Sequence, residues 1–259
     1  MKAVILAGGL GTRLSEETTD KPKPMVEIGD KPILWHIMKI YSSFGINEFI
    51  ICCGYKGYIV KEYFNNYSIH NSDVTFDLKK SKFSIKKNDA EDWKISCIDT
   101  GSNTQTGGRL KRVKDFFKKG DTFLFTYGDG VGDIDIAKSI LKHRESNKIA
   151  TITAVNPPGR FGALRINEKN EITSFEEKPT KGNTWINGGF FVLDYEIFDY
   201  IAGDDVPWED EPLKKMTKEK NLNCYFHDGF WQPMDTLREK NMLDQMCRDK
   251  KAPWITWKK

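Results

Sequence analysis

Short apolar runs rich in β-branched residues alternate with amphipathic stretches through the first half of the chain. The apolar runs predict buried strands, and the stretches in which apolar residues recur every three or four positions predict helices. The predicted strands are residues 3–7, 49–53, 122–126 and 149–155, and the predicted helices are residues 32–43, 56–65 and 134–143. Because strands that alternate with helices usually pair in parallel, the pattern indicates an α/β fold with a mostly parallel sheet flanked by helices.

Two segments depart from this alternation. Residues 73–98 contain short runs of alternating polar and apolar residues, which predict a small antiparallel insertion. Residues 163–175 predict a second antiparallel piece, a hairpin that turns at residues 168–170. Three further helices are expected at residues 194–202, 209–220 and 236–248. Neither a repeat nor a linker-like tract interrupts the chain, so we expect one domain, residues 1–259.

Composition and charge exclude several classes of protein. The first apolar run has five residues, whereas a secretion signal needs about 7–15 and a membrane span roughly 20. The five cysteines are an odd number without CxxC spacing, which is typical of the reduced thiols of a cytosolic protein. The net charge of +3 is small, and the basic segment 109–119 lacks interleaved aromatic residues beyond Phe116 and Phe117. We therefore expect a cytoplasmic protein that binds neither membranes nor nucleic acid.

The strongest chemical signal is the segment LAGGLGTRL, residues 6–14, directly after the first predicted strand. In an open parallel sheet the carboxyl ends of the strands face the ligand crevice, and glycines let backbone N–H groups approach an anion closely. The guanidinium of Arg13 can pair with phosphate oxygens. The segment is neither a G-x-G-x-x-G fingerprint, since Leu14 replaces the third glycine, nor a P-loop, since Gly11 precedes Thr12 and Arg13.

A second motif, KPKPM at residues 21–25, follows this loop. Pro22 and Pro24 predict an extended segment that can carry Lys23 back toward the glycines. The alternative is an ordinary glycine turn followed by a solvated loop.

Together, GGLGTRL and KPKPM resemble the signature of the sugar-phosphate nucleotidyltransferases. The resemblance implies a Rossmann-like fold of the nucleotide-diphospho-sugar transferase type, in which the glycine loop wraps a nucleoside triphosphate. It also implies that Arg13 grips the phosphates and that Lys23 lies at the α-phosphate. The nucleotide-binding residues expected on this basis are Leu6, Ala7, Gly8, Gly9, Leu10, Gly11, Thr12, Arg13, Lys23, Thr104, Arg109 and Gly128.

Two aspartates are candidate metal ligands. Asp129 follows the predicted strand 122–126 and lies between two glycines. Mg²⁺ prefers hard oxygen ligands and typically takes one or two carboxylates, with phosphate oxygens and water completing an octahedron. Asp235, in FWQPMDT, is the candidate for the second carboxylate, although Asp is also a preferred helix N-cap. Relatives of the family carry a metal-binding aspartate in a similar context, so the resemblance implies Mg²⁺ held by both.

Three segments are candidates for the sugar side. EEKP could be a charged hairpin exit or a phosphate and hydroxyl site, and the glycines of INGGF can mark close approach of a ligand to a strand. The resemblance places both segments, and the Phe-Gly pair of GRFGAL, around the sugar. The expected sugar-binding residues are Phe161, Gly162, Glu177, Lys178, Asn187 and Gly188. The expected catalytic residues are Arg13, Lys23 and Lys178.

The segment TGGRLKRV, residues 106–113, bears on the choice of nucleotide. It resembles the cytidylyl-transferring branch of the family, which implies CTP and glucose 1-phosphate as substrates and Arg109 reaching the nucleotide. Thymidylyl or uridylyl transfer and a catalytically silent nucleotide-sugar sensor are the alternatives, and a surface helix with solvated basic residues would explain the segment equally simply. By resemblance, the product would supply dideoxysugars of a bacterial surface polysaccharide.

The carboxyl-terminal tail APWITW contains Trp254 and Trp257. Either these indoles dock on their own domain or they form a subunit contact, where aromatic residues are enriched. Because members of the family are commonly oligomeric, the resemblance favours the contact. We therefore expect a homo-oligomer.

Overall fold

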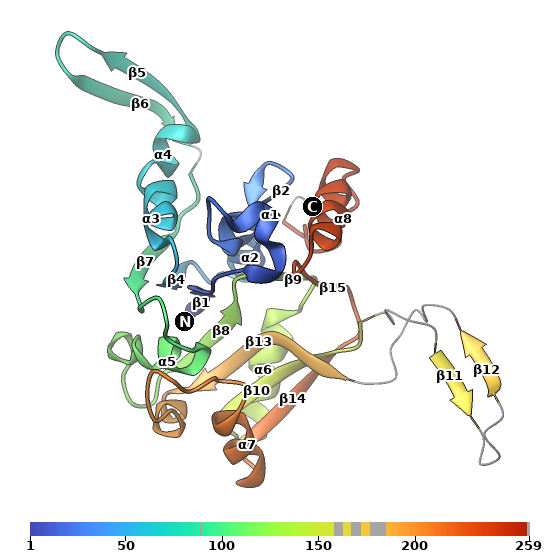
Figure 1. The fold of residues 1–259 in the computed structure, drawn as a ribbon. Coiled ribbons are helices and arrows are strands. Elements are labelled where there is room, and N and C mark those ends of the chain that lie inside the picture. Colours follow the sequence, from blue (N-terminus) through green and yellow to red (C-terminus); the bar gives the residue numbers. More distant parts are fainter. Residues whose placement is uncertain (89, 158–162, 167–171, 177–184, 258–259) are drawn as a thin grey trace.

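A computed structural model describes residues 1–88, 90–157, 163–166, 172–176 and 185–257. Within this part of the chain the central sheet has seven strands (Figure 1). Their order is β14 (Leu222–His227), β10 (Ala150–Val155), β13 (Ile186–Asp194), β8 (Thr122–Tyr127), β1 (Lys2–Ala7), β4 (Glu48–Cys53) and β7 (Lys94–Asp99). β13 pairs antiparallel with both neighbours, and the other pairings are parallel. The expected α/β fold with a mostly parallel sheet is confirmed.

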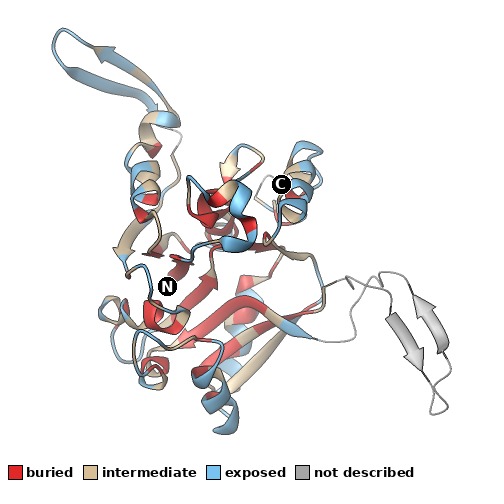
Figure 2. Ribbon diagram, viewed as in Figure 1, coloured by how far each residue is buried: buried red, intermediate tan, exposed pale blue. Residues whose placement is uncertain are grey.

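Helices cover both faces of this sheet, and its inner strands β10, β13, β8, β1 and β4 are mostly buried (Figure 2). α2 (Ile33–Ser42) and α6 (Ile136–Ser146) pack on one face, and α5 (Thr106–Lys111), the 3₁₀ helix η4 (Tyr195–Tyr200) and α7 (Glu211–Lys218) pack on the other. Alternate side chains of a strand point to opposite faces. In β1, accordingly, Ile5 joins the first core and Val4 joins the second.

The remaining elements surround this framework. The helices are η1 (Thr12–Leu14), α1 (Ser15–Thr18), η2 (Lys23–Met25), α3 (Gly57–Asn65), α4 (Tyr67–His70), η3 (Lys114–Phe116) and α8 (Leu237–Arg248). The small strands are β2 (Glu27–Ile28), β3 (Lys31–Pro32), β5 (Ser72–Asp77), β6 (Lys82–Asn88), β9 (Gly130–Gly132), β11 (Ala163–Ile166), β12 (Ile172–Glu176) and β15 (Trp231–Pro233). The strands and helices predicted for the first half are all present at nearly the expected bounds, and so are the later helices, α7 and α8.

The prediction for residues 73–98 is right for one half and wrong for the other. β5 and β6 form the expected antiparallel hairpin, but β7 joins the central sheet in parallel with β4. β7 is the edge strand and is half-buried, so its side chains alternate in polarity like those of an antiparallel strand. The hairpin predicted at residues 163–175 is confirmed as β11 and β12, and its turn lies outside the described residues. The helix expected at residues 194–202 is the 3₁₀ helix η4.

The carboxyl-terminal tail docks on its own chain. Trp254 is fully buried, stacks on Phe230 with ring centroids 5.5 Å apart, and directs its indole nitrogen at Nδ1 of His36, 3.3 Å away. The expectation that Trp254 belongs to a subunit contact is therefore wrong, because burying this large indole inside the domain already removes it from water. In the described part of the chain, no helix is both long and apolar enough to span a membrane.

Candidate active site

A large pocket of about 1280 Å³ opens at the carboxyl ends of β1 and β8. β13 runs antiparallel to them, so its first residues, Ile186 and Asn187, reach the same edge of the sheet. Residues of β15 and of the first turns of α8 complete the wall. The pocket therefore lies where a doubly wound sheet is expected to bind its ligand.

The loop after β1 is shaped by one glycine in a left-handed conformation. Gly11 has φ 66°, which a residue with a side chain adopts reluctantly, and it leads into the 3₁₀ turn η1. The hydroxyl of Thr18 donates to the carbonyl oxygens of Gly11 and Leu14, at 3.0 and 2.9 Å, and so holds the turn closed. No atom lies within 4 Å of the position that a Cβ on Gly9 would occupy, so a ligand in the pocket can approach the backbone there.

The side chain of Arg109 packs against this loop at Gly8. It is only 4% exposed, and its guanidinium donates to Oγ1 of Thr100 at 2.9 Å and to the carbonyl of Gly101 at 2.6 Å. A Cβ added to Gly8 would lie 2.1 Å from the guanidinium of Arg109, so the arginine occupies the space that a side chain at position 8 would need. Burial lowers the pKa of Arg109, yet an arginine remains charged in proteins. The interpretation of Arg109 as a solvated surface residue is wrong.

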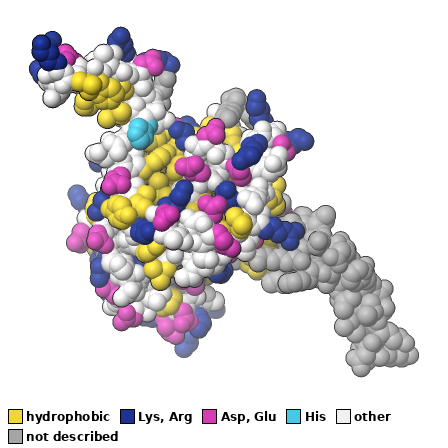
Figure 3. Space-filling model, turned by 45° about the horizontal axis from the view of Figure 1, so that its top comes forward, with side chains coloured by type: hydrophobic (Ala, Val, Ile, Leu, Met, Phe, Trp, Pro, Cys, Tyr) yellow, Lys and Arg dark blue, Asp and Glu magenta, His cyan; other side chains and the backbone are white. Residues whose placement is uncertain are grey.

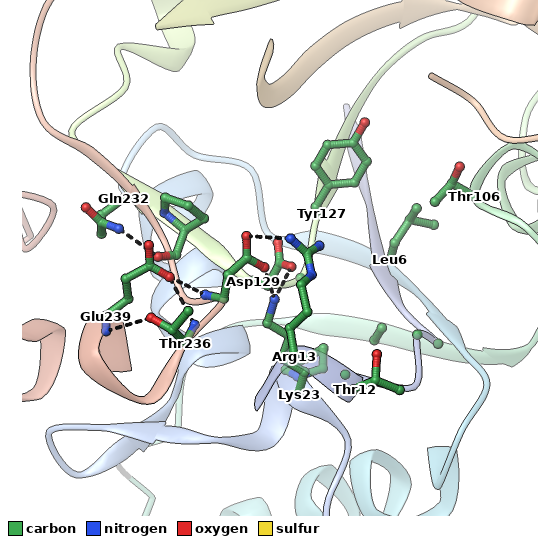
Figure 4. A pocket seen from close by; sticks show the side chains of 18 of the residues that line it. Leu6, Thr12, Arg13, Lys23, Thr106, Tyr127, Asp129, Gln232, Thr236 and Glu239 are labelled. Carbon is green, nitrogen blue, oxygen red and sulfur yellow. Dashed lines mark hydrogen bonds and ion pairs between the residues drawn. The ribbon is translucent and has the colours of Figure 1, made fainter. Parts of the chain in front are cut away.

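Lys23 lies between the two predicted metal ligands. Its Nζ is 2.7 Å from Oδ2 of Asp129 and 2.7 Å from Oδ1 of Asp235, and Arg13 pairs with the other oxygen of Asp235 at 3.1 Å (Figure 4). Burial alone would lower the pKa of Lys23, but the two carboxylates raise it above its ordinary value. Pro22 is extended as expected, whereas residues 23–25 form the 3₁₀ turn η2 instead of continuing the extension. The turn still brings Lys23 to the glycine loop, because the Cβ of Lys23 lies 3.3 Å from the position that a Cβ on Gly11 would occupy.

Asp235 is not the N-cap of α8. Thr236 caps this helix, because its side chain accepts from the backbone N–H of Glu239 while the carboxylate of Glu239 accepts from the backbone of Thr236 and Asp235. The reciprocal bonds fix the start of the helix and leave the carboxylate of Asp235 directed into the pocket.

The donor set fits a hard divalent cation. The carboxylates of Asp129 and Asp235 converge on one ammonium group, and both remain partly accessible, at 31% and 18% exposure. Among the described residues, no group of three or more His, Cys, Asp or Glu side chains could hold a metal ion. Two carboxylates are the number that Mg²⁺ typically takes from a protein when phosphate oxygens and water supply its other ligands.

The structure places the expected sugar-side residues unevenly. Asn187 lines the pocket and donates from Nδ2 to the hydroxyl of Tyr127 at 3.2 Å. Gly188 lines a separate small cavity, where its carbonyl accepts from Nε1 of Trp231 at 2.7 Å. The remaining four, Phe161, Gly162, Glu177 and Lys178, lie outside the described residues.

Most of the expected nucleotide-binding residues line the pocket. They are Leu6, Ala7, Gly8, Gly9, Gly11, Thr12, Arg13, Lys23, Thr104, Arg109 and Gly128. Leu10 is 56% exposed and lies outside the lining, because its side chain points to solvent.

Several lining residues were not anticipated from the sequence: Thr106, Tyr127, Glu209, Gln232, Arg238 and Glu239. Glu239 stands three positions after Thr236, and this capping-box spacing could have identified it. Glu209 carries no such signal.

Comparisons with known proteins agree with this architecture. Residues 2–236 match the family model described as nucleotidyl transferase. The chain is 56% identical over 257 residues to the glucose-1-phosphate cytidylyltransferase of Salmonella typhi, which covers 99% of this chain and 100% of that protein. It is 44% identical over 258 residues to the probable glucose-1-phosphate cytidylyltransferase of Bacillus subtilis (strain 168), with the same coverage of 99% and 100%.

A solved structure shares the fold at lower identity. HddC from Yersinia pseudotuberculosis complexed with GMP-PN superposes with a TM-score of 0.69 at 24% identity, covering 95% of this chain and 99% of that one.

Proposed function

The chain belongs to the nucleotidyl transferase family, and we propose that it transfers the cytidylyl group of CTP to α-D-glucose 1-phosphate, giving CDP-glucose and pyrophosphate. The observation that carries this proposal is the 56% identity to a glucose-1-phosphate cytidylyltransferase across the full length of both chains. The 257 matched residues cover 99% of this chain, which supports assigning the same reaction to it.

The proposed reaction is attack by a phosphate oxygen of the sugar phosphate on the α-phosphorus of CTP. The second pKa of a phosphate monoester is about 6, so the nucleophile is largely ionised at pH 7 and needs no general base. The obstacle is the approach of two anions. Catalysis then rests on positioning and on neutralising charge, and we assign the neutralising role to Arg13 and Lys23, two cations of the pocket lining. We assign the same role to Lys178 on the resemblance alone.

We propose Mg²⁺ as the cofactor, held by Asp129 and Asp235. Their convergence on one cationic group supports this assignment. When bound, the ion would supply electrostatic stabilisation of the phosphates and help to align them. Around it, the lysine, the arginine and the loop amides of this chain would hold the triphosphate in line with the sugar phosphate.

The experiment that tests the function is release of pyrophosphate with glucose 1-phosphate and each of CTP, UTP, dTTP and ATP, with and without Mg²⁺. We expect turnover with CTP and Mg²⁺, and a preference for CTP that can reach about 10⁴-fold where the site forms hydrogen bonds specific to cytosine. A preference for dTTP or UTP would support the alternative transfer reactions. Binding without turnover for every nucleotide would support the silent sensor.

We also propose that the protein is a homo-oligomer. The hairpin of β5 and β6 projects from the body (Figure 1), and apolar side chains gather on one of its faces (Figure 3). Phe76 and Phe83 pair across the strands with centroids 6.0 Å apart, yet they are 57% and 55% exposed. A two-stranded hairpin is marginally stable in water without a packing partner, and a second subunit would supply one. The molar mass in solution tests this proposal.

The biological role follows from the same resemblance. We propose that the CDP-glucose supplies dideoxysugars of a bacterial surface polysaccharide such as O-antigen. A strain that lacks the gene should lose those sugars from its polysaccharide.

A further inference from the structure

One carboxylate on the pocket wall is separate from the Lys23 cluster. Glu209 lies just before α7 and lines the pocket together with Thr106 and Tyr127. Figure 4 shows these two neighbours on the side of the pocket away from Gln232 and Glu239.

Two chains of hydrogen bonds lie beside this carboxylate, and one of them ends on it. In the first, the backbone N–H of Trp208 donates to Oγ1 of Thr106 at 2.8 Å, so the hydroxyl proton of Thr106 is free to point at Oε2 of Glu209, 2.6 Å away. Because a backbone N–H can only donate, the direction of this chain is fixed.

The second chain starts from another backbone amide. The N–H of Gly189 donates to Oδ1 of Asn187 at 2.7 Å, which orients the side-chain amide so that Nδ2 donates to the hydroxyl of Tyr127. Tyr127 and Glu209 line the same pocket, and burial together with the charge of Glu209 raises the pKa of Tyr127, so the phenol keeps its proton. The first chain thus orients Glu209 as an acceptor, and the second orients a protonated phenol beside it.

We infer that the Glu209 carboxylate accepts hydrogen bonds from hydroxyl groups of the sugar phosphate and selects the sugar, an inference that rests on the proposed function. A carboxylate would repel the phosphates, for which the pocket provides the cations Arg13 and Lys23. It suits neutral O–H donors, and of its roughly four lone-pair sites Thr106 takes one.

The link to β13 favours the sugar over the base. Tyr127 lines the pocket together with Glu209 and is hydrogen-bonded to Asn187 at the start of β13, the strand whose INGGF segment we expect on the sugar side. Thr106 acts as a positioning residue, since its hydroxyl bond holds the carboxylate in one orientation. The other donor that a carboxylate could recognise is the 4-amino group of cytosine, and the experiment separates the two.

The experiment measures steady-state kinetics of wild type, Glu209→Gln and the control Glu211→Gln with both substrates varied. Glu211 is an exposed acid two residues away that does not line the pocket. For Glu209→Gln we expect KM for glucose 1-phosphate to rise by about 10- to 100-fold, the range for a hydrogen bond to a charged group, while KM for CTP changes little. The control should match wild type, and unchanged thermal unfolding would show that Glu209→Gln folds normally.

The 2-, 3-, 4- and 6-deoxy analogues of glucose 1-phosphate give a second readout. Wild type should discriminate against at least one analogue by about tenfold or more, and Glu209→Gln should lose that discrimination. Thr106→Val, which removes the orienting bond to Glu209, should lose part of it.

Three results would overturn the inference. In the first, KM rises for CTP and the preference for cytosine is lost, which would place the base at Glu209. In the second, Glu209→Gln discriminates among the deoxy analogues as wild type does. In the third, wild type itself fails to use CTP and glucose 1-phosphate, and the proposed function falls as well.

Discussion

Asp129 can be tested by a substitution that removes its charge and little else. Asp129→Asn preserves the shape of the side chain and can still contact Lys23, but it loses the anionic oxygen that a divalent cation requires. We expect kcat/KM to fall by about 10²-fold or more, with thermal unfolding near that of wild type. Asp205→Asn, at an exposed position outside the pocket, is the matched control. Near-normal turnover of Asp129→Asn would contradict the metal assignment.

Arg109 and Arg112 are neighbours with opposite environments. The guanidinium of Arg109 is buried and donates to several groups of residues 100–102, whereas Arg112 forms an exposed pair with Asp204. A lysine cannot reproduce a guanidinium that donates in several directions. Arg109→Lys should therefore lower the free energy of unfolding by about 1–3 kcal/mol, measured by denaturant titration, and Arg112→Lys by less than about 1 kcal/mol. Equal losses of stability in the two variants would mean that the hydrogen bonds of Arg109 to residues 100–102 contribute no more than the exposed ion pair of Arg112.

At the scale of elements, the start of α8 sets the position of Asp235, a proposed metal ligand. Thr236→Ala removes the cap and should cost about 1 kcal/mol of stability, while Thr236→Ser should retain most of it. Because Asp235 immediately precedes the cap, fraying of the first turn should also raise the Mg²⁺ concentration needed for half-maximal activity. The Mg²⁺ dependence of both variants checks this, and a stability loss without any change in Mg²⁺ dependence would separate the cap from the site.

The sequence predicted which segments form strands and helices better than it predicted which segments pair or make contact with one another. Buried runs such as residues 122–126 have a clear periodicity, so β8 was found, but β7 was misassigned because an edge strand shows the alternation of an antiparallel one. Local motifs likewise identified Lys23, Asp129 and Asp235. The contact of Lys23 with both carboxylates, and the hydrogen bond from Thr106 to Glu209, depend on segments far apart in the chain. Periodicity and local spacing carry no information about such contacts.

At the scale of the whole molecule, the pocket joins both ends of the chain. The glycine loop lies near the amino terminus and α8 near the carboxyl terminus, and both line the same space. If residues 1–259 form one domain, as we propose, calorimetry should show one unfolding transition. CTP with Mg²⁺ should shift this single transition to higher temperature, because the ligands add about 2.7 kcal/mol to the free energy of unfolding at a concentration of 100 Kd. Two transitions, of which ligand moves only one, would indicate two domains.

The contacts of Lys23 have a consequence for the order in which ligands arrive. The two carboxylates are already balanced by two cations, Lys23 and Arg13, so the resting site is internally neutralised. A metal ion that binds alone must displace the ammonium group of Lys23 from the carboxylates, and this group then has no other anion to pair with. A metal ion that binds together with the triphosphate brings a phosphate with which Lys23 can pair instead. Titration calorimetry should therefore detect tight uptake of Mg²⁺ only together with nucleotide, and Lys23→Met should bind the bare ion more strongly than wild type does.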